Sequence, residues 1–144
     1  MRTREFVEKL EHERIVQAIA AAEKKTSGEI RVFILHGKVD DPVAAANEQF
    51  RKLGMTATRE RNAVLIFVAP RAQKFAVIGD AGIHQRGGNR FWQQLVGAMQ
   101  VHFRAANFTD AVVYAVQQTG ELLMRHFPRR LDDRNELPNA VEEM

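Results

Sequence analysis

Cysteine is absent from the 144-residue chain, and serine occurs once, at Ser27. Without cysteine the chain can form neither disulfide bonds nor cysteine-ligated zinc and iron–sulfur sites. Ser27 is not part of a Gly-x-Ser-x-Gly turn, which excludes a serine hydrolase of that type. The glycines between Gly79 and Gly88 fit neither a P-loop nor a dinucleotide fingerprint, because no Gly-Lys-Ser/Thr follows them and their spacing is wrong.

Long apolar runs are also missing. No stretch approaches the roughly 20 apolar residues of a membrane-spanning helix. The densely charged start of the chain has no apolar segment of the kind found in secretory signals. The sequence therefore predicts a soluble, cytoplasmic protein without a transmembrane segment.

Charge of one sign is not concentrated in any long run. The formal net charge is +3, and residues 129–144 contain three arginines and five acidic residues. Proteins that bind nucleic acids usually gather their basic residues on one face, with stacking aromatic side chains between them. The scattered charges argue against nucleic acid as a partner.

What the chain does contain is an alternation of helical and strand-like segments. Four residues separate the apolar segment 63–69 from the next strand, which predicts an antiparallel hairpin. A helix between the first two strands predicts that they run parallel through a right-handed crossover. We therefore expect an α/β fold, a three-layer α/β/α sandwich with a small central mixed sheet flanked by helices on both faces. The predicted strands are residues 29–36, 63–69 and 74–79, and the predicted helices are residues 13–25, 43–53, 89–104 and 110–126.

Several residues predict where helices begin and end. Asp41 is a typical N-cap, and Pro42 suits the first helical position after it. Thr109 predicts the cap of the last helix. Gly28 predicts a left-handed residue after the first helix.

The domain organisation follows from where the apolar periodicity begins and ends. We expect a single domain over residues 1–128, in which residues 1–11 either start a bent first helix or form an N-terminal appendage. Residues 129–144 lack a sustained apolar stripe, which predicts an acidic C-terminal tail or a segment that lies along the surface. Leu131, Leu137 and Val141 are the candidate anchors of that segment.

The predicted topology brings four polar residues to one edge of the sheet. Glu29 opens the first strand, Arg61 and Asn62 precede the second, and Asp80 follows the third. If the third strand is antiparallel to the second, its end lies beside the starts of the other two. We therefore expect these four side chains to converge.

This edge offers ligands for ions of either sign. Glu29 and Asp80 could hold a divalent cation, because carboxylate oxygens are the usual ligands of calcium and magnesium. Arg61, Arg86 and Arg90, together with the start of the following helix, could receive an anion. A purely structural interpretation stays open, in which Asp80 caps the helix or pairs with an arginine and Glu29 forms an ordinary salt bridge.

Six motifs follow one another in a distinctive order along the chain. Their order and spacing resemble the TPM-domain family, named after thylakoid, photosystem II and membrane proteins, and in particular its soluble cytoplasmic branch. The resemblance covers nearly the whole chain after about His12. It implies an α/β/α sandwich and divalent-cation binding, usually of calcium, and in plant relatives acid phosphatase activity. The motifs are SGEIRV at 27–32, FRKLGMTAT at 50–58, RNAVLIFVAP at 61–70, FAVIGDAGIH at 75–84, FW at 91–92 and NELPN at 135–139.

One departure from the family pattern concerns the metal. Cation-binding relatives tend to carry further acidic residues after the glycine motif, where this chain has Gln85, Arg86 and Asn89. Calcium prefers six to eight oxygen ligands, usually including several carboxylates. We therefore expect only weak binding of Ca²⁺ or Mg²⁺, with Glu136 in the C-terminal segment as a further candidate ligand.

Two functions stay open. The first is a module that binds a small ion, such as a small anion, or an unknown protein partner at the edge formed by Glu29, Asn62 and Asp80, and that is at most weakly catalytic. The alternative is a divalent-cation-dependent, acid-phosphatase-like hydrolase. In that enzyme a bound cation and arginines would neutralise a phosphate while a carboxylate, with Asp80 as the best candidate, assists the attack.

Overall fold

The computed structural model describes residues 11–129 and 141–143 of the chain. None of the helices in this part is long and apolar enough to cross a membrane. The helices are α2 (His12–Glu23), α3 (Pro42–Lys52), α4 (Ala81–Arg104) and α5 (Phe108–His126), and the 3-10 turn η1 spans Pro70–Ala72. The strands are β1 (Glu29–Ile34), β2 (Ala63–Ala69), β3 (Lys74–Gly79) and β4 (Val141–Glu143).

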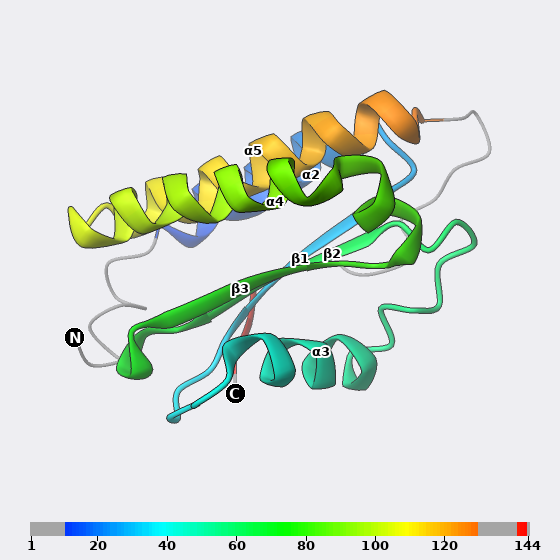
Figure 1. The fold of residues 1–144 in the computed structure, drawn as a ribbon. Helices are drawn as coiled ribbons and strands as arrows, with labels where there is room; N and C mark the ends of the chain where they lie inside the picture. The colour runs from blue at the N-terminus through cyan, green and yellow to red at the C-terminus, as the bar shows by residue number, and fades with distance from the viewer. Residues whose placement is uncertain (1–10, 130–140, 144) are drawn as a thin grey trace.

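The strands form one mixed sheet in the order β3-β2-β1-β4. Strands β1 and β2 run parallel, and β2 and β3 form the antiparallel hairpin that the short connection predicts. Helices α2, α4 and α5 cover one face of the sheet and α3 covers the other (Figure 1). The predicted three-layer α/β/α architecture is therefore confirmed. Strand β4, which pairs in parallel with β1, lies in the segment for which the sequence predicts a tail.

Two apolar clusters lie on the two faces of the sheet. Val64 and Ile66 point into the larger cluster, beneath α2, α4 and α5, and Leu65 and Phe67 point into the smaller one, against α3. Successive side chains of a strand face opposite ways, so a central strand covered on both sides must be apolar throughout. This explains why every residue of β2 is buried.

Helix α4 begins at Ala81, and non-helical backbone at Gly88, with φ 71° and ψ 165°, divides it into two helical segments. The second segment follows Gly88 and ends at Arg104, as the predicted helix 89–104 does. The first segment lies where the sequence predicts only a glycine-rich bend. The carboxylate of Asp80 accepts a hydrogen bond from the backbone N–H of Ala81 at 2.8 Å and caps this first segment.

Two predictions about helix ends were wrong. The described glycines with positive φ are Gly54 and Gly88, so Gly28 does not adopt the left-handed conformation. It is needed for space, because a Cβ at Gly28 would lie 2.6 Å from Cδ2 of Leu123. Helix α5 begins after Asn107, and Thr109 does not cap it.

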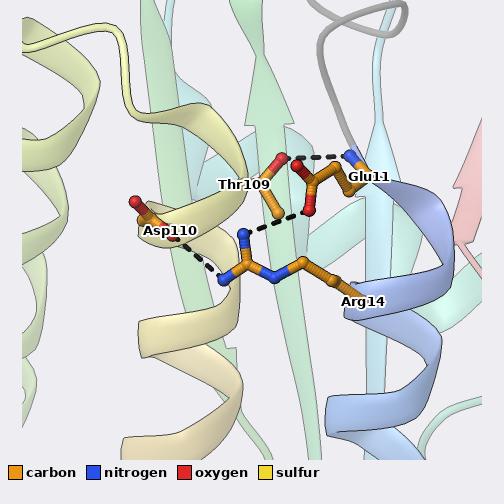
Figure 2. Close-up of polar contacts among 4 residues, drawn as sticks. All are labelled: Glu11, Arg14, Thr109 and Asp110. Carbon is orange, nitrogen blue, oxygen red and sulfur yellow. Dashed lines mark hydrogen bonds and ion pairs between the residues drawn. The ribbon is translucent and has the colours of Figure 1, made fainter.

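Thr109 instead joins α5 to the start of α2. Its hydroxyl oxygen accepts a hydrogen bond from the backbone N–H of Glu11 at 3.0 Å (Figure 2). The guanidinium of Arg14 donates to Glu11 at 3.2 Å and to Asp110 at 3.1 Å. These contacts set the position of α2 against the first turn of α5.

Candidate functional site

Three strand ends meet at one edge of the sheet. The backbone N–H of Asp80, after β3, donates to the carbonyl of Ala63 in β2 at 2.9 Å. The N–H of Glu29, at the start of β1, donates to the carbonyl of Asn62 at 3.4 Å. The backbone thereby places Glu29, Asn62 and Asp80 next to one another along this edge.

Asp80 forms a bidentate ion pair with Arg61. Nε of Arg61 lies 2.6 Å from Oδ2 of Asp80, and Nη2 lies 2.9 Å from Oδ1. The hydrogen bond to Asp80 raises the pKa of Arg61 above its usual value. The side chain of Asp80 is 6% exposed and that of Arg61 is 51% exposed. Both structural roles that the sequence left open for Asp80, helix cap and ion-pair partner, are therefore present.

A close backbone contact holds Arg61 in place. The N–H of Gly82 donates to the carbonyl of Arg61 at 2.8 Å, and Arg61 has a positive φ of 54°. A Cβ at Gly82 would lie 2.2 Å from the carbonyl oxygen of Glu60. Only glycine allows the loop before β2 to lie this close to the first turn of α4.

Asn62 is a buried anchor between two loops. Its side-chain amide donates to the hydroxyl of Ser27 at 3.2 Å, and its backbone N–H donates to the hydroxyl of Thr58 at 3.2 Å. Its exposed fraction is 1%. The amide group therefore fixes the edge of the sheet from inside.

Glu29 lies beside a second buried carboxyl group, that of Glu23 at the end of α2. Glu23 is 2% exposed and Glu29 is 1% exposed. Oε2 of Glu23 accepts a hydrogen bond from the backbone N–H of Ile30 at 2.9 Å. Burial raises the pKa of Glu23 to about 9, and the hydrogen bond with the side chain of Glu29 contributes to the rise. At neutral pH the pair therefore retains one proton, which spares the protein a second buried negative charge.

Glu23 was not predicted as a site residue, although the spacing of buried residues in α2 points to it. Ile15, Ile19 and Glu23 are spaced four residues apart and form the buried stripe of α2. A carboxylic acid in the third position of such a stripe is unusual, because acidic side chains are almost never fully buried unless they are paired. That spacing would have indicated a partner for Glu29.

Arg86 and Arg90 lie on α4 and take no part in the contacts of this edge described above. Arg90 is exposed on α4, beyond the kink at Gly88. The guanidinium of Arg86 lies over the ring of Phe127, at 5.8 Å from its centroid. Glu136 lies outside the described residues.

The donor set at this edge does not fit a tight calcium site. Both carboxylate oxygens of Asp80 accept hydrogen bonds from Arg61. The carboxyl group of Glu29 is hydrogen-bonded to that of Glu23, and the pair retains a proton. Among residues 11–129 and 141–143, no group of three or more histidine, aspartate or glutamate side chains could hold a metal ion. The edge therefore holds buried carboxyl groups and the half-exposed guanidinium of Arg61 instead of a cluster of free carboxylates.

Comparison with known proteins gives a consistent match. Residues 3–122 match the model of the TPM domain. The NMR structure of the BA42 protein from the psychrophilic bacterium Bizionia argentinensis is similar to this chain, with 37% sequence identity and a TM-score of 0.85. The similarity covers 92% of each of the two chains. No curated protein matches the chain at a significant level.

Proposed function

The chain belongs to the TPM-domain family, and on this basis we propose that it is a binding module with at most weak catalytic activity. Its ligand, a small ion or a partner protein, docks at the edge formed by Glu29, Asn62 and Asp80. The ion pair between Arg61 and Asp80 carries the proposal. A carboxylate with both oxygens held by a guanidinium is poorly suited to act as a nucleophile or general base.

A divalent cation binds this edge only weakly. The guanidinium of Arg61 raises the cost of adding positive charge beside Asp80. We expect calcium to bind with a Kd of roughly 10⁻⁴ M or weaker, which is the low-affinity end of known calcium modules. Magnesium, which gives up its water ligands reluctantly, should bind no more tightly. A small anion would instead use Arg61, whose side chain is 51% exposed.

Thermal unfolding at increasing calcium concentration tests the cation. The melting temperature should be unchanged at micromolar calcium and should rise at millimolar calcium, because a ligand at ten times its Kd stabilises the folded state by about 1.4 kcal/mol. Asp80→Asn should abolish the rise. Asp40→Asn, which removes an exposed carboxylate elsewhere, should preserve it. Marked stabilisation at micromolar calcium would contradict the proposal and would point to further ligands, with Glu136 the first to replace.

The second candidate function is the phosphatase-like hydrolase, which membership of the TPM-domain family implies. A chromogenic phosphate ester with calcium or magnesium separates the two candidates. We expect no robust turnover. Turnover that disappears in Asp80→Asn and persists in Asp40→Asn would establish the hydrolase instead.

The assignment to the soluble cytoplasmic branch, and a cytoplasmic location, stay predictions of the sequence. A protein partner can be sought by capture on the wild-type protein, with the Arg61→Gln and Asp80→Asn variants as negative controls.

A further inference from the structure

A cavity of about 480 Å³ lies at the other end of the sheet from Asp80. Its walls come from the end of β2, the start of β3, the last turn of α4 and the first residue of α5. Figure 1 shows the junction of α4 and α5 at the same end of the molecule as the turn between β2 and β3. The volume lies within the roughly 300–1,000 Å³ of small-molecule sites.

Three aromatic side chains form much of the cavity wall. The rings of Phe75 and Phe103 are 5.1 Å apart and tilted by 41°, and those of Phe103 and Phe108 are 6.4 Å apart and tilted by 39°. Phe75 and Phe103 are only partly buried by the protein itself. Aromatic rings that converge on a concave surface can bury the apolar part of a ligand.

The polar residues of the wall select the charge of that ligand. Its charged residues are Lys74 and Arg104, and no described residue of the wall is acidic. Nζ of Lys74 donates to the backbone carbonyl of Asp40, outside the cavity, at 2.6 Å. The ammonium of Lys74 keeps its charge in this contact, so both residues favour an anionic ligand, and the guanidinium of Arg104 can bind a carboxylate through two parallel hydrogen bonds.

Two amide side chains, of Gln73 and Gln100, complete the polar part of the wall. Gln73 has a φ of 54°, a left-handed conformation that is uncommon for residues other than glycine. Its backbone N–H donates to the carbonyl of Pro70 at 3.0 Å, which holds it in this conformation. Strained residues of this kind cluster at ligand-binding sites.

We propose that this cavity binds a small monocarboxylic acid with an aromatic or branched apolar body. The apolar body lies against Phe75, Phe103 and Phe108, and the carboxylate binds Arg104. The planar carboxylate matches the two parallel N–H groups of the guanidinium, and the charge of Lys74 adds to the attraction.

Titration of ¹⁵N-labelled protein with 3-phenylpropionate, monitored by NMR, tests the site. The neutral 3-phenylpropionamide, which has nearly the same shape, is the control ligand. Chemical-shift changes should concentrate at the backbone amides of Phe75, Gln100 and Phe108, and the acid should bind about tenfold more tightly than the amide.

Two arginine variants separate a specific contact from general electrostatics. Arg104→Gln should weaken binding of the acid about tenfold and leave binding of the amide unchanged. Arg125→Gln, which removes an exposed arginine near the other end of α5, should change neither. Arg104 and Arg125 are both exposed, so both variants should keep the wild-type melting temperature. Phe75→Leu should weaken the binding of both the acid and the amide.

The assignment of a carboxylate ligand would be overturned if the acid and the amide bound with equal affinity. It would also be overturned if Arg104→Gln bound the acid as tightly as the wild type does. The absence of cavity shifts with either compound at millimolar concentration would overturn the site itself. Neither variant alters Arg61 or Asp80, so these outcomes do not depend on the function proposed for the other end of the sheet.

Discussion

The buried carboxyl groups at the Asp80 edge are neutralised in two different ways. The charge of Asp80 is balanced by the guanidinium of Arg61. Glu23, beside Glu29, instead keeps its proton, because burial raises its pKa to about 9. Asp80 is therefore an ionised carboxylate paired with a cation. Glu23 is a neutral acid that becomes a buried negative charge when a rising pH removes its proton.

The proton on Glu23 predicts a dependence of stability on pH. Its folded-state pKa of about 9 exceeds the ordinary value of 4.5, so the folded state binds the proton more tightly than the unfolded state. This contribution to stability is complete below about pH 4.5 and is lost as the pH rises toward 9. The free energy of unfolding, measured in urea at several pH values, should fall by up to about 1.4 kcal/mol per pH unit in that range.

Glu23→Gln provides the matched test of this dependence. Glutamine keeps an oxygen that can accept the hydrogen bond from Ile30 and cannot ionise, so the variant should flatten the pH profile and be more stable than the wild type near pH 9. Glu121→Gln, at an exposed position on α5, should leave the slope unchanged. A wild-type slope in Glu23→Gln would show that other groups cause the dependence.

Gly82 gives a steric prediction at the same scale. Gly82→Ala would place a Cβ at 2.2 Å from the carbonyl of Glu60 and 2.7 Å from that of Arg61, so the loop must move away from α4. We expect the free energy of unfolding to fall by about 2–4 kcal/mol. Gly97→Ala is the control, because no atom lies within 4 Å of its Cβ position, and it should stabilise helix α4 by about 0.5–1 kcal/mol. If Gly82→Ala lowered the free energy of unfolding only slightly, the loop before β2 would be able to move away from α4 at little cost.

Among the elements, the kinked helix α4 and the short strand β4 distinguish this fold most. Gly88 combines a φ of 71° with a ψ of 165°, a region that is essentially restricted to glycine. The first turn of α4 touches the loop before β2, where the N–H of Gly82 donates to the carbonyl of Arg61, and α4 as a whole packs on α5. Strand β4 extends the sheet beyond β1, where Val141 pairs with Val32.

The packing of β4 can be measured through Val141. This side chain is partly buried against the larger apolar cluster. Val141→Ala should therefore lower the free energy of unfolding by about 1 kcal/mol. Val43→Ala, at a valine that is 53% exposed on α3, should cost less than about 0.5 kcal/mol, since alanine is also the better helix former. Equal effects of the two changes would show that β4 contributes little to stability.

In the whole molecule, one sheet separates two apolar clusters of unequal size. The larger cluster lies under α2, α4 and α5, and the smaller lies against α3. Both clusters share β1 and β2, whose successive side chains alternate between them. Loss of packing on one face should therefore weaken the other through the shared strands.

This shared sheet predicts a single cooperative unfolding transition. Met99 in the larger cluster and Met55 in the smaller one are both fully buried. Met99→Ala and Met55→Ala should each lower the free energy of unfolding by about 2–5 kcal/mol, and each should shift one common transition in calorimetry and circular dichroism. A second, separate transition in Met55→Ala would show that α3 and its cluster unfold independently.

The layered fold could be predicted from the sequence because its signals are local. The apolar run of β2, the short turn to β3 and the helical periodicity of α2 and α5 each span a few neighbouring residues. Those patterns determine the layers, the antiparallel hairpin and the parallel crossover. The topology in turn determines that Glu29, Asn62 and Asp80 lie at one edge of the sheet.

Only the tertiary structure decided what these side chains do there. The ion pair of Asp80 with Arg61 and the pairing of β4 with β1 join residues distant in sequence, and the proton retained by Glu23 depends on burial. Charge, burial and close approach depend on distances in space, and a local pattern of residues does not contain those distances. The same reason explains the helical segment before Gly88 and the cavity beside Arg104, which arise from the way separate elements pack together.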